Sequence, residues 1–134
     1  MKVVLDTNIL VAAGFNPRSS SAEIVRAVKA GELEMIWNQA TRAESKHILK
    51  QIPPLLWPRF ERLFAPEGEF TRRTHPERFK QIEDPDDRKF AALAAAADAV
   101  LISNDEHLLA VRDRLDVRIQ TPTEMVQQAR GGRP

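Results

Sequence analysis

The sequence predicts an α/β protein built on a doubly wound, mostly parallel sheet of about five strands flanked by helices. Short, continuously apolar runs at Val3–Leu5 and Ala99–Ile102 are typical of strands buried on both faces, because a strand with one wet face alternates polar and apolar residues. Predicted strands and helices alternate along the chain, and parallel neighbours require such crossovers. No linker composition interrupts the 134 residues, so we expect one domain over 1–128 and a flexible tail over 129–134.

Composition excludes several classes of protein. Twenty lysines and arginines oppose 19 aspartates and glutamates, so the net charge of +1 does not indicate a nucleic-acid binder. The absence of cysteine excludes a disulfide framework and thiolate chemistry. The apolar run after Lys2 is too short for a signal peptide, and no run approaches membrane-spanning length. We therefore expect a soluble, cytoplasmic protein without membrane association.

The first third of the chain is expected to hold a strand, a helix and a second strand. After the first strand, the composition of residues 14–19 indicates a loop. Ser20 and Glu23 have the spacing of a capping box, so a helix is predicted to begin at Ser20 and to end at Gly31. The apolar residues of 33–37 then predict the second strand.

Two helices and a weak strand are expected in the middle of the chain. Asn38 is the predicted N-cap of a helix that carries Glu44 in its second turn. Beyond Pro53-Pro54, bulky apolar residues at helical spacing predict a further helix, and a weak third strand is expected over 70–74. The apolar residues of that helix are Leu56, Trp57, Phe60, Leu63 and Phe64.

The last third of the chain holds the strongest helix signal. Asp84 is expected to cap a helix whose first position is Pro85 and which runs to about Ala97. The buried strand over 99–102 follows and ends in Ser103-Asn104-Asp105. The remaining elements are expected to be a short helix over 107–114, a strand over 117–120 and a last helix from Thr123.

Four carboxylates follow predicted strand ends or open the helices after them. Asp6 and Asp105 come directly after buried strands, whereas Glu44 and Asp87 lie in the opening turns of helices that follow strands. Because parallel strand ends of one polarity share an edge, these side chains can converge there. Carboxylates a few ångströms apart resist ionising together unless a cation is bound, and oxygen-only donors suit Mg²⁺ or Mn²⁺. Such a site is suited to phosphodiester hydrolysis.

Four sequence blocks, taken together, resemble the signature of PIN domains. The branch they are most similar to is the toxin component of bacterial toxin–antitoxin systems, akin to VapC-type ribonucleases, and the resemblance covers essentially the whole chain. The blocks are Leu5-Asp6-Thr7-Asn8, Asn38 followed by Glu44, Asp84-Pro85-Asp86-Asp87-Arg88-Lys89-Phe90, and Ser103-Asn104-Asp105-Glu106-His107-Leu108-Leu109. The segment Thr121–Glu124 also resembles the end of that branch.

The resemblance implies a PIN-like fold and a metal-dependent endoribonuclease that acts as the toxin of a toxin–antitoxin pair. The implied catalytic residues and ligands of one or two Mg²⁺ or Mn²⁺ ions are Asp6, Glu44, Asp87 and Asp105. Asp87 is favoured over Asp84 and Asp86 because it keeps the family's spacing to Asp105, and Asp84 is explained as a cap. Whether Asp84 or Asp86 joins Asp87 stays open.

Supporting roles are implied around these carboxylates. A hydroxyl at Thr7 or Ser103 is expected to hold a neighbouring carboxylate, and Asn8 is expected to support the same turn. Ser103-Asn104 stands where Thr-Gly is more usual in the family, which removes no ligand. Three arginines that lie near these carboxylates in the sequence are candidates for binding RNA phosphates, namely Arg18, Arg42 and Arg88.

Self-association and capture by an antitoxin are further implications. The helix over 56–64 carries more bulky apolar surface than one stripe needs, so we expect a homodimer, and an antitoxin that packs against this helix and places a basic side chain near the four carboxylates. Alternatively, the five apolar residues of this helix are ordinary core. The alternative is a catalytically silent RNA- or protein-binding module whose carboxylates only cap helices. Two further classes are disfavoured. A receiver domain would need a set of acids and a lysine after the last strand, which this chain does not supply. A haloacid-dehalogenase-type phosphatase would need a second aspartate at position 8, where this chain has Asn8.

Overall fold

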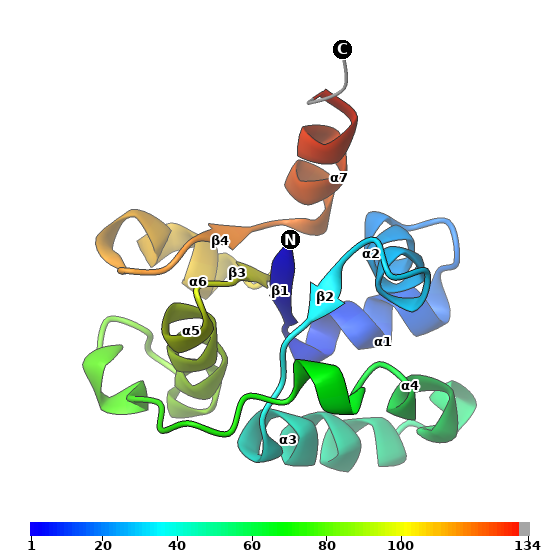
Figure 1. Cartoon of the computed structure of the whole chain (residues 1–134), viewed down its shortest axis with the longest axis horizontal. Coiled ribbons are helices and arrows are strands. Elements are labelled where there is room, and N and C mark those ends of the chain that lie inside the picture. The colour runs from blue at the N-terminus through cyan, green and yellow to red at the C-terminus, as the bar shows by residue number, and fades with distance from the viewer. Residues whose placement is uncertain (132–134) are drawn as a thin grey trace.

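A parallel sheet flanked by helices forms the centre of the computed structural model, which describes residues 1–131 (Figure 1). The strand order is β2-β1-β3-β4, and all three pairings are parallel. The strands are β1 (Lys2–Leu5), β2 (Glu34–Met35), β3 (Val100–Ile102) and β4 (Ile119–Gln120). The α/β class is confirmed, with four strands in the sheet instead of about five.

The register brings the carboxyl ends of the central strands to one level. Leu5 lies opposite Ile102, and Ile102 lies opposite Gln120. The chain after each strand therefore leaves from one edge of the sheet, as expected for parallel strands. Asp6 and Asp105, the first and last of the four carboxylates, follow β1 and β3 and therefore lie at this edge. We call the region of Asp6, Glu44, Asp87 and Asp105 the acidic edge.

The predicted third strand over 70–74 is wrong. A single parallel bridge joins Trp37 to Glu69, where the Phe70 N–H donates to the Trp37 carbonyl at 2.7 Å. Thr71 and the two arginines after it are exposed, so the segment has no apolar face to bury in a sheet. Gly68 permits the close approach, since a Cβ there would lie 2.0 Å from the Met35 carbonyl oxygen.

Helix α1 (Thr7–Phe15) follows Asp6 and extends through Gly14 and Phe15, so the loop predicted over 14–19 begins only at Asn16. Helix α2 (Ser20–Lys29) is capped by Ser19, whose Oγ accepts from the Ala22 N–H at 3.1 Å. The predicted capping box between Ser20 and Glu23 is therefore wrong.

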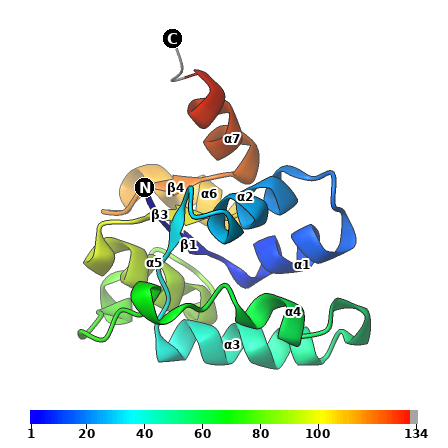
Figure 2. The same ribbon diagram turned by 45° about the vertical axis from the view of Figure 1, so that its right-hand side comes forward.

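Those two residues contact the last helix instead, α7 (Pro122–Gly131). The Ser20 hydroxyl lies 3.3 Å from Thr123 Oγ1, and the Glu23 carboxylate accepts from Arg130 at 2.7 Å. Helix α7 stands out from the sheet beside α2 (Figure 2). It reaches Gly131, so the predicted tail begins too early, and 132–134 lie outside the described residues.

Two helix starts agree with the prediction from sequence. Asn38 caps α3 (Gln39–Lys50) in a reciprocal capping box with Thr41. Asp84 caps α5 (Pro85–Ala97) by accepting from the Asp86 N–H at 2.9 Å. Helix α5 is followed by its C-cap Asp98, which takes a left-handed φ of +53° at the opposite end of the helix from Asp84.

The predicted apolar helix over 56–64 is wrong in form and in role. The segment is the 3₁₀ turn η1 (Pro53–Leu55) followed by the short helix α4 (Pro58–Glu61). Three prolines remove backbone donors and break a longer helix. Trp57, Phe60, Leu63 and Phe64 are at most 8% exposed, whereas Leu56 is 51% exposed. The expected unpartnered apolar face is therefore mostly core.

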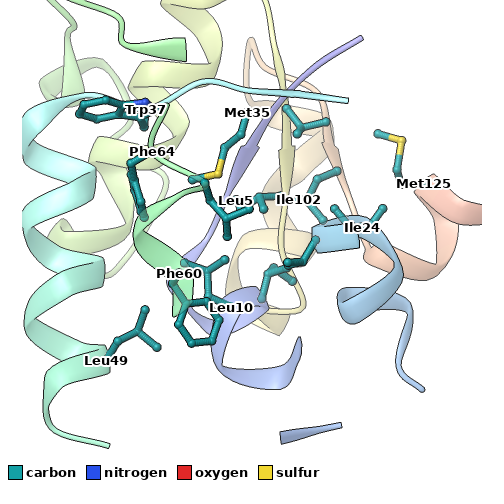
Figure 3. Packing of buried hydrophobic residues seen from close by; sticks show 14 of the residues in the cluster. Leu5, Leu10, Ile24, Met35, Trp37, Leu49, Phe60, Phe64, Ile102 and Met125 are labelled. Carbon is teal, nitrogen blue, oxygen red and sulfur yellow. The ribbon is translucent and has the colours of Figure 1, made fainter. Parts of the chain in front are cut away.

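Two apolar clusters cover the two faces of the sheet. One joins β1 and β3 to α1, α2, α3 and α4, and Figure 3 shows Phe60 near Leu10 and Leu49 within it. Trp37 and Phe64 pack edge to face in the same cluster, with ring centroids 5.7 Å apart. The other cluster packs the alanine-rich face of α5 against Val4 and Leu101.

The short elements at the chain's outer surface complete the description. They are η2 (Pro66–Gly68), η3 (Pro76–Arg78), α6 (Glu106–Val111) and η4 (Arg112–Arg114). Among the helices in the described part of the chain, none is long and apolar enough to cross a membrane.

Candidate active site

Asp6 lies at the centre of the acidic edge, between the end of β1 and the start of α1. Its side chain is only 5% exposed, yet both carboxylate oxygens have donors. Oδ1 accepts from the Asn8 N–H at 3.1 Å, and Oδ2 accepts from the Ser103 hydroxyl at 2.7 Å. Burial raises the pKa of Asp6, the two hydrogen bonds oppose this, and the charge of Asp105 adds to the rise.

Ser103 connects the ends of β1 and β3. It is fully buried, donates to Asp6, and accepts from the Asp105 N–H at 3.0 Å. Asp105 in turn caps α6 by accepting from the His107 N–H at 2.8 Å. The structure therefore places Ser103 where a hydroxyl holding a neighbouring carboxylate was expected.

Asp87 enters the same edge from the first turn of α5. It is half-buried, and its pKa is raised to about 7 by burial first, then by the charges of Asp6, Asp105 and Asp84. A hydrogen bond with the Asp105 side chain adds to this rise. A carboxyl whose proton is held by neighbouring negative charge marks a place where a cation would be stabilising.

Asp84 and Asp86 lie at the rim. Asp84 is exposed and uses its carboxylate as the cap of α5. Asp86 is also exposed, and its charge contributes to raising the pKa of Glu44. Asp87 alone of these three is part-buried, which agrees with its choice as the acidic residue of this helix that faces Asp6 and Asp105.

Glu44 reaches the edge from α3 and is held by a lysine. Its Oε1 accepts from Lys89 Nζ at 3.0 Å. Burial raises the pKa of Glu44, Lys89 opposes this, and the charges of Asp86 and Asp6 add to the rise. The mutual charge effects of the four predicted carboxylates show that the structure brings them to one region. Helices α3 and α5 meet there, beside the end of β1 (Figure 1).

Two supporting contacts were not expected from the sequence, that of Lys89 with Glu44 and that of Thr7 with Ser45. Thr7 holds no carboxylate, and its hydroxyl lies 2.8 Å from the buried Ser45 hydroxyl, which ties α1 to α3. Asn8 supports Asp6 through its backbone N–H, while its side chain is exposed. Ser45 follows Glu44 directly, and Lys89 lies two residues after Asp87. Nothing in the local sequence shows that their partners come from other helices.

Within residues 1–131, none of the three candidate arginines forms an ion pair with one of the four carboxylates. Arg18 is exposed and lies beyond the far end of α1, whose nine residues span about 13 Å. Arg42 pairs with Glu61 at 3.5 Å, and its guanidinium lies over the Trp57 ring, 5.4 Å from the centroid. The Arg88 Nε donates to the Ile82 carbonyl at 2.8 Å.

The donor chemistry of the edge fits a hard divalent cation. Asp6, Glu44, Asp87 and Asp105 supply oxygen atoms only, and their mutual charges raise three of the four pKa values. Within residues 1–131, however, no three acidic or histidine side chains are arranged so that they could hold a metal ion as they stand. Asp6 and Asp105 cap helices, and Glu44 is paired with Lys89, so part of this donor set is engaged in other contacts.

Comparison with known proteins identifies the family to which this chain belongs. The chain is 25% identical to an uncharacterized protein of Methanocaldococcus jannaschii, MJ1680, over 96% of this chain and 91% of the relative. Its fold is similar to a chain in the crystal structure of VapBC2 from Rickettsia felis bound to a DNA fragment from their promoter. That likeness has a TM-score of 0.63 and 20% identity, and it covers 90% of this chain and 98% of that one. The family described as the PIN domain matches residues 2–107. The chain therefore belongs to the PIN domain family.

Proposed function

We propose that this protein is a divalent-metal-dependent endoribonuclease and the toxin of a toxin–antitoxin pair. PIN domains are generally nucleases and generally use divalent metal ions, which supports the class of reaction. The observation that carries the proposal is Asp87, whose pKa is raised to about 7 in part by the charges of Asp6 and Asp105. This accumulated negative charge sits at the carboxyl edge of a parallel sheet, where α/β proteins bind ligands.

Each residue of the edge has a role in this proposal. When bound, Mg²⁺ or Mn²⁺ would supply a water of lowered pKa and offset charge on a phosphoryl oxygen. Asp6, Glu44, Asp87 and Asp105 would hold the one or two ions. Ser103 keeps the Asp6 carboxylate oriented by its 2.7 Å hydrogen bond, and the Asn8 N–H does so from the other side.

RNA is the proposed substrate, and a cytoplasmic location follows from that choice. An antitoxin protein is the proposed partner, because the similar fold comes from VapBC2. A homodimer also stays part of the proposal. Because Trp57, Phe60, Leu63 and Phe64 are core, the segment over 56–64 no longer supports either interaction, which must use another surface.

Cleavage of total RNA tests this function directly. We expect the purified protein to shorten RNA in the presence of Mg²⁺ or Mn²⁺, and EDTA to stop the reaction. Asp6→Asn is nearly isosteric and should abolish cleavage while the circular dichroism spectrum stays unchanged. Asp113→Asn, on the turn η4, is the matched control and should cleave like the wild type. A folded wild type that leaves RNA intact with either ion would contradict the proposal.

A silent binding module is the competing function, and one observation favours it. Asp6 and Asp105 both cap helices, α1 and α6, so two of the four carboxylates already have structural roles. A silent module should bind RNA or a protein with equal affinity in the wild type and in Asp87→Asn, with no dependence on divalent ions. The nuclease predicts that the ion changes both binding and cleavage.

A further inference from the structure

Lys89 occupies an unusual place beside the acidic edge. Within residues 1–131 it is the one basic side chain that forms an ion pair with any of the four carboxylates. Two other cations on these helices have partners elsewhere, since Arg42 pairs with Glu61 and Arg88 binds the Ile82 carbonyl. The acidic edge thus has a single resident counter-ion.

The pair connects two helices that both carry proposed ligands. Lys89 lies two residues after Asp87 on α5, and Glu44 lies on α3. The Nζ–Oε1 distance is 3.0 Å, and the two side chains are 26% and 17% exposed. This partial burial gives the pair less screening than a surface pair would have.

We propose that Lys89 is a competing counter-ion that shares Glu44 with the metal ion, so that an ion takes the Glu44 carboxylate only as Lys89 leaves it. The proposal rests on the metal-dependent function above. An ammonium group and a divalent ion on one carboxylate repel each other at short range, even if they use different oxygens. Lys89 therefore weakens metal binding and is a positioning residue for Glu44.

A plain structural ion pair is the opposing explanation, and metal affinity separates the two. A structural pair would stabilise the contact between α3 and α5. Its removal would then leave the affinity for Mn²⁺ unchanged or make it weaker. A competing counter-ion predicts tighter binding when its charge is removed. Charge and shape can be separated, because methionine keeps much of the lysine stem and arginine keeps the charge.

Calorimetric titration with Mn²⁺ alone is the test, using the full chain. Lys89→Met should bind Mn²⁺ roughly threefold to tenfold more tightly than the wild type, the range expected for a partly screened ion pair. Lys89→Arg should restore the wild-type affinity. Lys80→Met, an exposed lysine that enters no ion pair within the described residues, is the matched control and should also bind like the wild type.

A second pair of variants guards against misfolding and against a through-space effect. If Lys89→Met does not fold, Lys89→Gln removes the charge and keeps a hydrogen-bonding side chain. In a Glu44→Gln background, the gain from Lys89→Met should shrink, because the shared carboxylate is gone. An equal gain in both backgrounds would overturn the sharing of Glu44.

The remaining outcomes are also decisive. A folded Lys89→Met or Lys89→Gln whose affinity for Mn²⁺ is unchanged or lower overturns the role of Lys89 and leaves the proposed function standing. A wild type that binds no Mn²⁺ overturns the proposed function, and the competition for Glu44 with it.

Discussion

Hydrogen-bond donors of the backbone, a serine and a lysine hold three of the four carboxylates, whereas Asp87 shares a hydrogen bond with another carboxyl group, that of Asp105. Asp6 has the Ser103 hydroxyl and a backbone N–H, Asp105 has the His107 N–H, and Glu44 has Lys89. Burial and the negative charges of its neighbours raise the pKa of Asp87 to about 7. Ionised Asp87 is therefore the point at which the fold is least favourable without a cation.

Asp87→Asn should stabilise the protein at alkaline pH when divalent ions are removed with EDTA. Unfolded Asp87 ionises near its ordinary pKa of 3.8, whereas the folded side chain keeps its proton up to about pH 7. Wild-type stability should thus fall as pH rises between these values and level off above them. At pH 8 the variant should be more stable by about 1 kcal/mol, because solvent screening at this half-exposed site reduces the effect.

Urea denaturation at pH 5 and pH 8 measures this difference. At pH 5 the folded wild type is still protonated at Asp87, but the unfolded chain is already largely ionised, so the advantage of the variant should be roughly a third of that at pH 8. Asp116→Asn, in the part-exposed loop before β4, controls for the loss of one negative charge. A difference of the same size at both pH values would contradict the raised pKa.

Asp84→Ala should cost stability and keep activity, in contrast to Asp87→Asn. Asp84 caps α5 through the Asp86 N–H, and loss of such a cap costs about 0.5–2 kcal/mol. Asp87 faces the other carboxylates, so its replacement should abolish cleavage. Activity measured well below the melting temperature of each variant separates the two effects. Should Asp84→Ala stop cleavage in a folded protein while Asp87→Asn does not, the assignment of Asp87 is wrong.

At the scale of elements, local signals predicted helix starts better than strands. Asn38 and Asp84 cap helices as expected, because a cap depends on residues within one turn. Ser20 failed as a cap because Ser19, beside it, serves equally well. Strands β2 and β4 have two residues each, and their extent depends on partners far away in sequence. The segment over 70–74 shows the same dependence.

The candidate site likewise has a part that local sequence predicts and a part that it does not. Its four carboxylates follow from strand ends and helix starts, which are readable in order along the chain. The contacts of Lys89 with Glu44, and of Thr7 with Ser45, join helices 38–45 residues apart. No pattern within one helix predicts them. Their chemistry therefore becomes visible only once the packing of α1, α3 and α5 is known.

Trp57→Ala should destabilise the single chain itself. Trp57 is 6% exposed, packs on Phe64 with centroids 5.5 Å apart, and donates to Glu61 at 3.2 Å. Loss of a buried aromatic side chain costs about 3–5 kcal/mol. Leu56→Ala, at the exposed neighbour, should change stability by less than about 0.5 kcal/mol. Urea denaturation measures both, and a loss that depends on protein concentration would instead point to an interface at Trp57.

At the scale of the whole molecule, the acidic edge joins parts of the chain that are far apart in sequence. Asp6 lies near the N-terminus, Glu44 on α3, Asp87 on α5 and Asp105 after β3. A ligand that binds all of them exists only for the folded chain. Its binding free energy therefore adds to the stability of the fold as a unit.

Mn²⁺ should raise the melting temperature of the whole chain. A ligand at 100 times its dissociation constant adds about 2.7 kcal/mol, which corresponds to a shift on the order of 10 °C for a protein of this size. The shift should be smaller at pH 5 than at pH 8, because protonated Asp87, with its pKa of about 7, is a poor ligand. Asp6→Asn should lose most of the shift. Asp98→Asn, at the opposite end of α5, should keep it, since asparagine also accepts the left-handed φ of +53° found there. Scanning calorimetry with and without Mn²⁺ measures these shifts, and an equal shift in wild type and Asp6→Asn would show that the ion binds away from the acidic edge.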